Sequence, residues 1–309
     1  MREYRFCIVD VFAEAPYRGN QLAVVFDDGT LSDRDMLEIT REMHYSETVF
    51  ISLASLRATE KGIRTFTPPA EVPFAGHPCH GAAYCINKAL HENASGTDQP
   101  QDAVSSPGMT GLLLKTKAGL IPISVSQSGD TTTWWMEQLQ PDFGEVLPAS
   151  LLARILGLAE DRFDSEYPAQ WVSTGLPFVI VPLRGIDAVR QAKADWELFH
   201  ELLPGVVPGD ILVFTDECDD DSKDLHVRVL VDFPGIPEDP ATGSANGCLA
   251  AYLLERGYMG QDSLRYQAEQ GIEMGRPSVL HVTASKENGK FTILVGGEVH
   301  LVAEGTLYR

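Results

Sequence analysis

The sequence has none of the features of a membrane-spanning or disulfide-bonded protein. No stretch of its 309 residues approaches the roughly 18 apolar residues that a membrane helix needs, and the opening MREYRFCIVDVF lacks the apolar core of a signal peptide. Cysteine is scarce: the five cysteines are an odd number and include no CxxC pair. These absences predict reduced thiols in a cytoplasmic protein.

Basic residues are few compared with acidic ones. The chain has 24 Lys and Arg against 44 Asp and Glu, which gives a formal net charge of −20. This excess of negative charge argues against nucleic acid or an anionic membrane surface as a partner. The hydrophobic content of 44% is sufficient for a real core, and the length fits one large domain or two of ordinary size.

The hydrophobic pattern alternates between strands and helices, which predicts an α/β protein. Ser32, with Asp35 three positions later, predicts the N-cap of one helix, and Gly257 predicts the C-terminal end of another. Residues 91–110, rich in Ser, Gly and Pro, predict an exposed excursion. Further strands are expected at 4–12, 22–26, 46–54 and 62–68, and further helices at 80–90 and 187–203.

Two stretches of the chain share one pattern. Residues 77–83 and 239–245, separated by 162 positions, both read (His/Asp)-Pro-x-x-Gly-(Ala/Ser)-Ala before a helical segment. Further upstream, residues 18–25 and 174–181 are both glycine-led turns before an apolar strand. These matches predict two homologous halves, whose equivalent helix starts would meet at one cleft.

The repeated pattern has the chemistry of an anion-binding corner. A helix start offers unpaired backbone N–H groups and a positive dipole end, and Gly81 and Gly243 would let a carboxylate approach closely. His77 or Asp239 would then stand beside the carbon that bears the carboxylate. In the alternative interpretation Pro and Gly only shape two turns, and Asp239 is an N-cap.

Glu47 is a third candidate for proton transfer. A carboxylate on an apolar strand face is costly unless it is paired or neutralised, and loss of solvent raises its pKa toward the range of a general base. The alternative is a buried salt bridge to Arg64 on the next strand. The residues expected to share the face of Glu47 are Tyr45, Val49, Ile51 and Leu53.

Two other sites are considered and set aside. A pair of thiols could catalyse racemisation from two sides, but Cys79 and Cys248 are not equivalent in the repeat, and we expect both to be small apolar fillers. The stretch HPCH offers His77, Cys79 and His80 as metal ligands. No second ligand cluster accompanies them, so no metal is expected.

Four separated motifs resemble those of the phenazine-biosynthesis PhzF-like isomerases, relatives of diaminopimelate epimerase. They are SETVF, IRTFTPPAEVPFAGHPCHGAA, STGLPF and PEDPATGSANGCLAAYL, in that order. The resemblance implies an α/β (α+β) fold of two pseudo-symmetric lobes, each a mixed sheet wrapped around a central helix. The lobes would comprise residues 1–122 plus about 296–309, and residues 123–295, with the active site in the cleft between them.

The resemblance also assigns roles to residues. The catalytic acid/base corresponds to Glu47, with His77 and Asp239 as its partners, and the substrate-binding asparagine corresponds to Asn20. The backbone nest corresponds to Gly76, Gly243 and Ser244. The family needs no cofactor, which agrees with the absence of a glycine-rich dinucleotide fingerprint, and it implies a homodimer in a biosynthetic process.

The function that we expect is that of a cofactor-independent isomerase that shifts a proton on a small carboxylate-bearing substrate. Glu47 would remove a proton from one carbon and return it to another, while His77 and Asp239 polarise the substrate or relay the proton. Because these two groups differ in charge, they break the symmetry that a racemase would keep. The alternatives are an amino-acid racemase or epimerase that uses the same cleft, and a non-catalytic small-ligand-binding protein.

Overall fold

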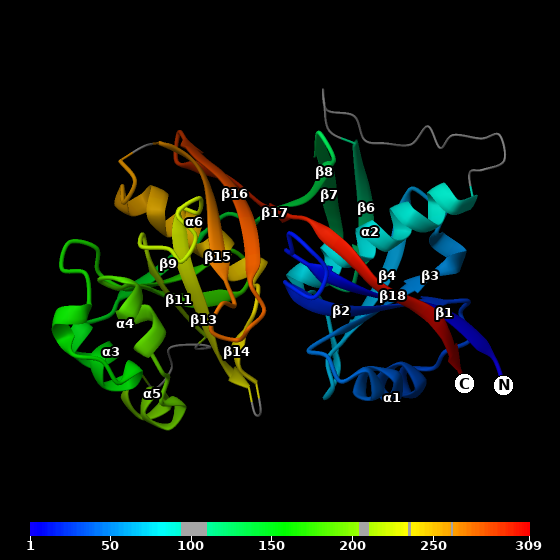
Figure 1. Cartoon of the computed structure of the whole chain (residues 1–309), viewed down its shortest axis with the longest axis horizontal. Helices are drawn as coiled ribbons and strands as arrows, with labels where there is room; N and C mark the ends of the chain where they lie inside the picture. The colour runs from blue at the N-terminus through cyan, green and yellow to red at the C-terminus, as the bar shows by residue number, and fades with distance from the viewer. Residues whose placement is uncertain (94–109, 204–209, 234–235, 261) are drawn as a thin grey trace. The chain divides into compact units, whose positions relative to one another are not determined.

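A computed structural model describes residues 1–93, 110–203, 210–233, 236–260 and 262–309 (Figure 1). The chain forms two compact units. Unit 1 comprises Met1–Met136 and Gly296–Arg309, and unit 2 comprises Glu137–Val295. Of the polar segment expected to form an excursion, residues 94–109 lie outside the described residues.

Unit 1 is built on a mixed sheet whose strands run in the order β18-β1-β2-β3-β4-β6-β7-β8. The pairs β2–β3 and β4–β6 are parallel and the others antiparallel, while β5 pairs with β4. The strands are β1 (Glu3–Val11), β2 (Asn20–Asp27), β3 (Thr48–Ser52), β4 (Glu60–Phe66), β5 (Glu71–Val72), β6 (Thr110–Thr116), β7 (Gly119–Ser128), β8 (Thr131–Glu137) and β18 (Val299–Tyr308).

Two helices pack against opposite faces of β2. Leu22 contacts α2 (Gly76–Asn93), whereas Val25, an odd number of positions away, packs with α1 (Asp33–Met43). Ser32 caps α1, as predicted, and it also forms a capping box with Asp35. The helix α2 contacts β1, β2, β3, β6, β7 and β18, so it is the central helix of the unit. A short 3₁₀ turn, η1 (Leu53–Ser55), follows β3.

Unit 2 repeats this plan with a sheet in the order β9-β10-β11-β12-β13-β15-β16. The parallel pairs are β11–β12 and β13–β15, and β14 pairs with β13. The strands are β9 (Asp142–Val146), β10 (Gln170–Ser173), β11 (Pro177–Pro182), β12 (Ile211–Thr215), β13 (Leu225–Phe233), β14 (Ile236–Asp239), β15 (Ser263–Gln270), β16 (Ser278–Glu287) and β17 (Lys290–Gly297), which leads back to unit 1.

The two sheets follow the same series of pairings. From β18 and from β9 onward, the neighbours are antiparallel, antiparallel, parallel, antiparallel, parallel and antiparallel. The counterpart of α2 is α6 (Gly243–Arg256), whose residues 243–254 are all buried and which ends at Gly257 in the left-handed conformation. The topology therefore confirms the two related halves that the sequence repeat predicted.

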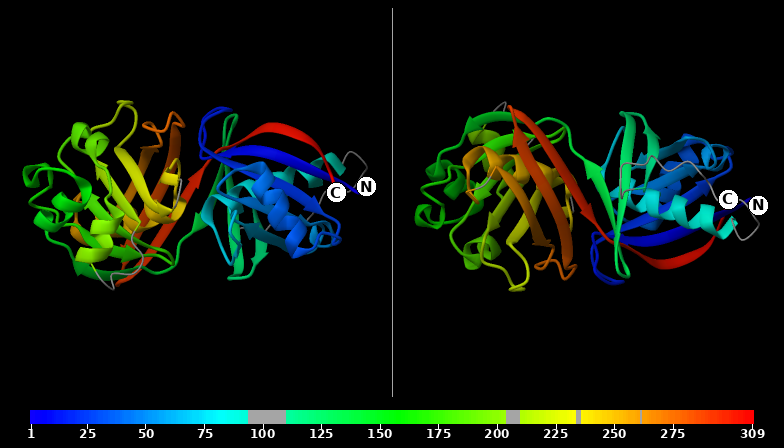
Figure 2. Two further views of the ribbon diagram at one scale, coloured as in Figure 1. Left: turned by 90° about the horizontal axis from the view of Figure 1, so that it is seen from below. Right: turned by 90° about the horizontal axis from the view of Figure 1, so that it is seen from above.

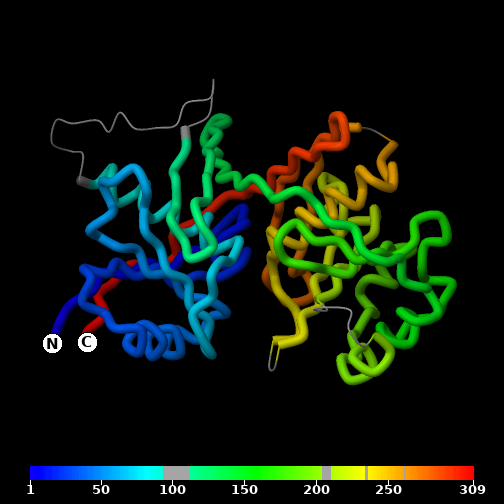
Figure 3. Tube along the Cα trace, turned by 180° about the vertical axis from the view of Figure 1, so that it is seen from behind, coloured from blue at the N-terminus to red at the C-terminus, as the bar shows by residue number. Residues whose placement is uncertain are grey.

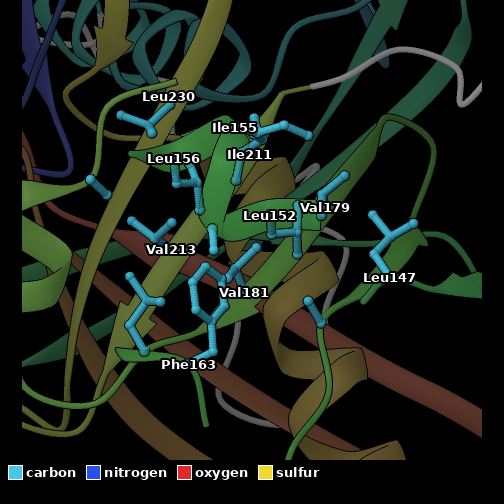
Figure 4. Packing of buried hydrophobic residues seen from close by; sticks show 14 of the residues in the cluster. Leu147, Leu152, Ile155, Leu156, Phe163, Val179, Val181, Ile211, Val213 and Leu230 are labelled. Carbon is cyan, nitrogen blue, oxygen red and sulfur yellow. The ribbon is translucent and has the colours of Figure 1, made fainter. Parts of the chain in front are cut away.

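The core of unit 2 has a second layer of helices, α3 (Ala149–Leu156), α4 (Ile186–Gln191) and α5 (Trp196–Leu202), with the 3₁₀ turn η2 (Glu160–Arg162). Leu152, Ile155 and Leu156 of α3 pack on the valines and isoleucines of β11 and β12 (Figure 4). The prediction of one helix over 187–203 is wrong. The backbone N–H groups of Lys193 and Asp195 bond to α3 carbonyls, and this contact breaks the segment into two short helices.

The first and last strands lie side by side in unit 1. β18 pairs with β1 from Glu3↔Tyr308 to Val11↔Val299, and all views keep the red strand beside the blue one (Figure 2). The two chain ends meet through hydrogen bonds between the backbones of Arg2 and Arg309 (Figure 3). None of the helices in the described part of the chain combines the length and apolar character that crossing a membrane requires.

Candidate active site

Glu47 lies where the chain enters β3, one residue before the strand begins. Its side chain is only 19% exposed. Burial raises the pKa of the Glu47 carboxyl, and a hydrogen bond from Ser46 only partly opposes this effect. Among the residues that the structure describes, none forms a hydrogen bond with Glu47 Oε2. Glu47 is therefore a carboxyl group that keeps its proton to a higher pH than usual.

His77 stands beside Glu47 in the first turn of α2. Its Nε2 lies 3.6 Å from Glu47 Oε2, and its Nδ1 lies 3.4 Å from Asn20 Nδ2. Asn20 shares a face of β2 with Leu22, so its side chain points toward α2. With this orientation of the Asn20 amide, its nitrogen donates to Nδ1, and a neutral imidazole then carries its proton on Nε2, which faces Glu47. Unit 1 thus brings together Asn20, Glu47 and His77.

The salt bridge that we considered for Glu47 does not form with Arg64. The Arg64 guanidinium instead makes a two-pronged contact with Glu71, at 2.9 and 2.6 Å, and a third contact with Asp33 at 2.8 Å. Opposite charge therefore satisfies Arg64 without Glu47. The arrangement is the one expected if Glu47 is kept for another role than holding β3 to β4.

Unit 2 holds the second set of predicted residues. Asp239 is the last residue of β14, and its Oδ2 accepts a hydrogen bond from the Thr242 hydroxyl. Thr242 is the N-cap of α6, which excludes that role for Asp239. The Thr242 side chain makes no capping bond. The first-turn N–H groups at Gly243 and Ser244 are therefore not capped by the Thr242 side chain. This corner has the positive character that suits a carboxylate.

The two corners are less alike than the sequence pattern suggested. The helix α2 begins at Gly76, so His77 is helical and Gly81 lies in the second turn, whereas α6 begins at Gly243. A Cβ on Gly81 would come within 2.4 Å of Leu22 Cδ2. This close packing of α2 on β2 explains a glycine at position 81 without any ligand.

The cysteines and His80 serve the core. Cys79 is fully buried, and burial raises the pKa of its thiol to about 12; burial likewise raises the pKa of Cys248 to about 11. Both groups are therefore poor thiolate bases. His80 is buried against Phe12, with its Nδ1 3.1 Å from the Gly76 carbonyl oxygen. All five cysteines are free thiols, as predicted.

The sequence of the whole chain resembles those of known proteins. Residues 9–305 match the model of the PhzC-PhzF family, described as phenazine biosynthesis-like protein. The chain belongs to this family. PhzC-PhzF relatives include an uncharacterised isomerase of Mesorhizobium japonicum, 30% identical with full coverage of both chains. Another is the trans-2,3-dihydro-3-hydroxyanthranilate isomerase of Pseudomonas aeruginosa, 30% identical over 99% of each chain.

Solved structures with the same fold are also known. The phenazine biosynthesis protein of Bacillus anthracis, assigned to the PhzF family, matches all of both chains with a TM-score of 0.84 and 26% identity. A hydroxyproline epimerase from Agrobacterium vitis shares the fold alone, with a TM-score of 0.57 and 13% identity over 99% of this chain and 92% of its own. The predicted family, fold class and enzyme class are confirmed: the chain is a PhzC-PhzF isomerase.

Sequence reasoning missed the residues that hold the Asp239 corner of this PhzC-PhzF protein. Gln270, at the end of β15, is fully buried and bonds to both Asp239 and Thr242. Asn246, in α6, bonds to the same glutamine and to the Thr242 carbonyl. Thr242 belongs to the motif that carried the resemblance, but nothing in the sequence around Gln270 distinguishes it from an ordinary strand residue.

Proposed function

We propose that this PhzC-PhzF protein is a cofactor-independent isomerase that shifts a proton on a small carboxylate-bearing substrate. The observation that carries the proposal is the Glu47 carboxyl. Its pKa is raised by burial, and it lies 3.6 Å from His77 Nε2. A carboxyl group whose pKa is raised in this way holds a proton more tightly than an ordinary carboxylate, which suits it to take a proton and return it.

In the proposed reaction the carboxylate of Glu47 removes a proton from one carbon of the substrate and becomes neutral. The same proton then returns to another carbon as the double bond moves, which restores the carboxylate. His77, held by Asn20, would donate a hydrogen bond from Nε2 to the charge that develops on the substrate. Such a proton shift balances with acid/base groups alone and needs no oxidant or reductant.

The second set of residues would hold the substrate. We propose that Gly243 and Ser244 bind its carboxylate through the N-terminal end of α6, with Asp239 beside the reacting carbon, and that Gly76 lies next to His77 at the same ligand. A carboxylate matches the chemistry in the name of the Pseudomonas relatives, whose substrate is a hydroxylated dihydro derivative of anthranilate.

The test is proton exchange in D2O with trans-2,3-dihydro-3-hydroxyanthranilate as the probe. We expect the wild type to incorporate deuterium at carbon as the double bond shifts, followed by NMR. Glu47→Gln should slow this exchange by about 10²- to 10⁴-fold, because the amide cannot carry the proton. Binding of the probe, measured by calorimetry, should change little.

Glu71→Gln is the matched control. Glu71 is a half-buried glutamate of unit 1 that pairs with Arg64 and Lys117, and its loss should leave exchange intact. Unchanged exchange in Glu47→Gln would refute the proposed role. Exchange at a stereocentre without a shift of the double bond would instead indicate an epimerase, and binding without exchange in the wild type a ligand-binding protein.

A further inference from the structure

Gln270 ties together the turn that presents Asp239. Its side chain is fully buried at the end of β15. Gln270 Nε2 donates to the Asp239 carbonyl oxygen at 2.8 Å and to Thr242 Oγ1 at 3.1 Å. Gln270 Oε1 accepts from Thr242 N at 3.2 Å and from Asn246 Nδ2 at 3.0 Å. One amide group therefore spans the whole turn from β14 to α6.

Two backbone groups fix the orientation of this amide. The Asp239 carbonyl only accepts and the Thr242 N–H only donates, so Gln270 Nε2 must face Asp239 and Oε1 must face Thr242 N. In the reversed amide, Oε1 would face the Asp239 carbonyl oxygen, which also only accepts, and Nε2 would face the Thr242 N–H, which also only donates. Such a mismatch is costly, and the observed orientation is the stable one.

The orientation of the amide determines the direction of the Thr242 hydroxyl. Because Gln270 Nε2 donates to Thr242 Oγ1, the hydroxyl oxygen acts as the acceptor in that bond. Its single hydrogen is then available for Asp239 Oδ2, the other neighbour of Thr242 Oγ1. The hydrogen bonds thus all point in one direction: the Gln270 amide donates to the Thr242 hydroxyl, and that hydroxyl donates to the Asp239 carboxylate.

Close packing holds the same turn from a second side. Gly271, which follows Gln270, has a φ of +75°, and a Cβ at this position would lie 2.6 Å from the Pro240 carbonyl oxygen. The backbone after β15 therefore lies directly against the residue that follows Asp239. The end of β15 contributes both hydrogen bonds and contact to this corner.

We propose that Gln270 is a positioning residue of the isomerase, which directs the Thr242 hydroxyl so that it donates to Asp239 and keeps that carboxylate ionised and oriented. The inference rests on the proposed role of Asp239 in the active site. A hydroxyl that donates to a carboxylate favours its charged form. Gln270 itself touches no substrate in this scheme and acts through Thr242.

The charged groups on the elements packed against β14 are largely engaged with one another. On β13, Arg228 pairs with Glu238 of β14 at 2.7 Å. His226 of β13 pairs with Glu269 of β15 at 2.6 Å and with Glu273, which follows β15, at 3.0 Å. Arg276 lies in the turn after β15, where its carbonyl approaches Gly271. The helix α6 carries no charged residue before Glu255. A substitution at Thr242 or Gln270 removes none of these charged side chains.

The experiment is a titration of the side-chain carboxyl carbon of Asp239 by NMR, with ¹³C-labelled aspartate and the signal assigned from Asp239→Asn. It needs no substrate, so it is independent of the exchange test for Glu47. Thr242→Val removes the hydroxyl but no helix cap, and Gln270→Met removes the amide at similar size. Each should raise the titration midpoint of Asp239 by about one pH unit.

Three comparisons separate this role from a general loss of structure. Thr242→Ser keeps a hydroxyl and should titrate like the wild type. Gln170→Met removes a buried glutamine that bonds to Gly144 and to Arg256, at the other end of α6 and about 20 Å from Gly243, and should also leave the midpoint unchanged. The double variant of Thr242 and Gln270 should shift no further than Thr242→Val, because both act through one hydroxyl.

An unshifted midpoint in folded Thr242→Val or Gln270→Met would overturn the proposal, as would additive shifts in the double variant. If Gln270→Met does not fold, Gln270→Glu keeps the acceptors for Thr242 N and Asn246 but loses the donor. An unshifted midpoint in that variant would overturn the proposal equally. A confirmed shift together with normal exchange in Asp239→Asn would refute the proposed function of Asp239 instead.

Discussion

His226 lies on β13 without exposed surface, and each of its ring nitrogens faces a carboxylate. Nδ1 is 2.6 Å from Glu269 and Nε2 is 3.0 Å from Glu273. Asp219, His226 and Glu269 bring ligand atoms within 4.8 Å of one another, but Asp219 already pairs with Arg190 and Glu269 accepts two backbone N–H groups. A protonated His226 imidazole supplies positive charge between Glu269 and Glu273, and the guanidinium groups of Arg190 and Arg228 also approach Glu273.

This cluster makes stability depend on pH. Burial alone would lower the pKa of His226, but the hydrogen bonds to Glu269 and Glu273 outweigh it and raise the pKa to about 9 from the ordinary 6.5. The contribution is complete below about pH 6.5 and is lost as the pH rises to about 9. We expect the free energy of unfolding to fall by up to about 3 kcal/mol over this range, measured by urea denaturation.

His200 provides the control for this effect. It is an exposed histidine that pairs with Asp232 at 2.7 Å, and an exposed pair contributes little to stability. His200→Gln should keep the pH dependence, whereas His226→Gln should remove most of it. A stability that is flat between pH 6.5 and 9 in the wild type would contradict this account.

Residues differ in how far the sequence reveals their roles. Glu47 could be singled out because a carboxylate in an apolar stretch violates the pattern around it. Asn20 was identified only through the family resemblance, and its contact with His77 was not predicted at all. Gln270 could not be found, because its role depends on four hydrogen bonds to three residues, which lie in β14, in the turn before α6 and in α6 itself. Hydrogen bonds between distant segments leave no local pattern.

At the scale of elements, the sequence was sufficient to predict a helix end wherever the residues next to that end determine it. The Ser32 N-cap of α1 and the Gly257 end of α6 were both predicted, since each depends on a few neighbouring residues. The start of α2 was predicted too late, at residue 80 rather than Gly76. The structure includes Pro78 in the first turn of α2, where a proline is well tolerated because its missing N–H has no helical partner to lose.

The packing of α2 on β1 and β2 gives a prediction at this scale. In Gly81→Ala the new methyl group would meet Leu22 Cδ2 at 2.4 Å and the Cγ2 atoms of Val9 and Val11 at 3.1 and 3.2 Å. Alanine favours a helix over glycine, but this overpacking should dominate and destabilise unit 1 by about 1–3 kcal/mol. Thermal and denaturant unfolding would measure the change.

The matched experiment for Gly81 is a double variant. Leu22→Ala alone should destabilise by leaving a cavity, and Gly81→Ala in the same chain should fill part of it. The double variant should therefore be destabilised by less than the sum of the two single variants, because the two residues are in contact. Strict additivity would mean that α2 does not pack on Leu22 as the structure describes.

At the scale of the whole molecule, β18 completes a sheet that begins with β1. Without β18, the edge of β1 from Glu3 to Val11 would lose its backbone partners on that side. The internal repeat could be detected in the sequence, but this crossing could not, because strand pairing between residues 3 and 308 has no local signal. Only the resemblance to a known fold predicted it.

Deleting residues 299–309 tests this dependence. We expect unit 1 to lose protection from hydrogen exchange over β1 and β2, while unit 2, which is contiguous in sequence, keeps its protection. Arg309→Ala is the control, since it removes only exposed ion pairs with Asp35 and Glu38 and should cost under about 1 kcal/mol. Full protection of β1 in the truncated chain would contradict the prediction.

The position of β18 also has a consequence for synthesis on the ribosome. Residues 137–295 emerge as one uninterrupted unit and have all their sheet partners as soon as they are made. The edge of β1 must instead wait until Tyr308 has been added, roughly 15 to 60 s at about 5–20 residues per second. Throughout that time the nascent chain carries an open strand edge, the form of the protein most exposed to aggregation and to chaperones.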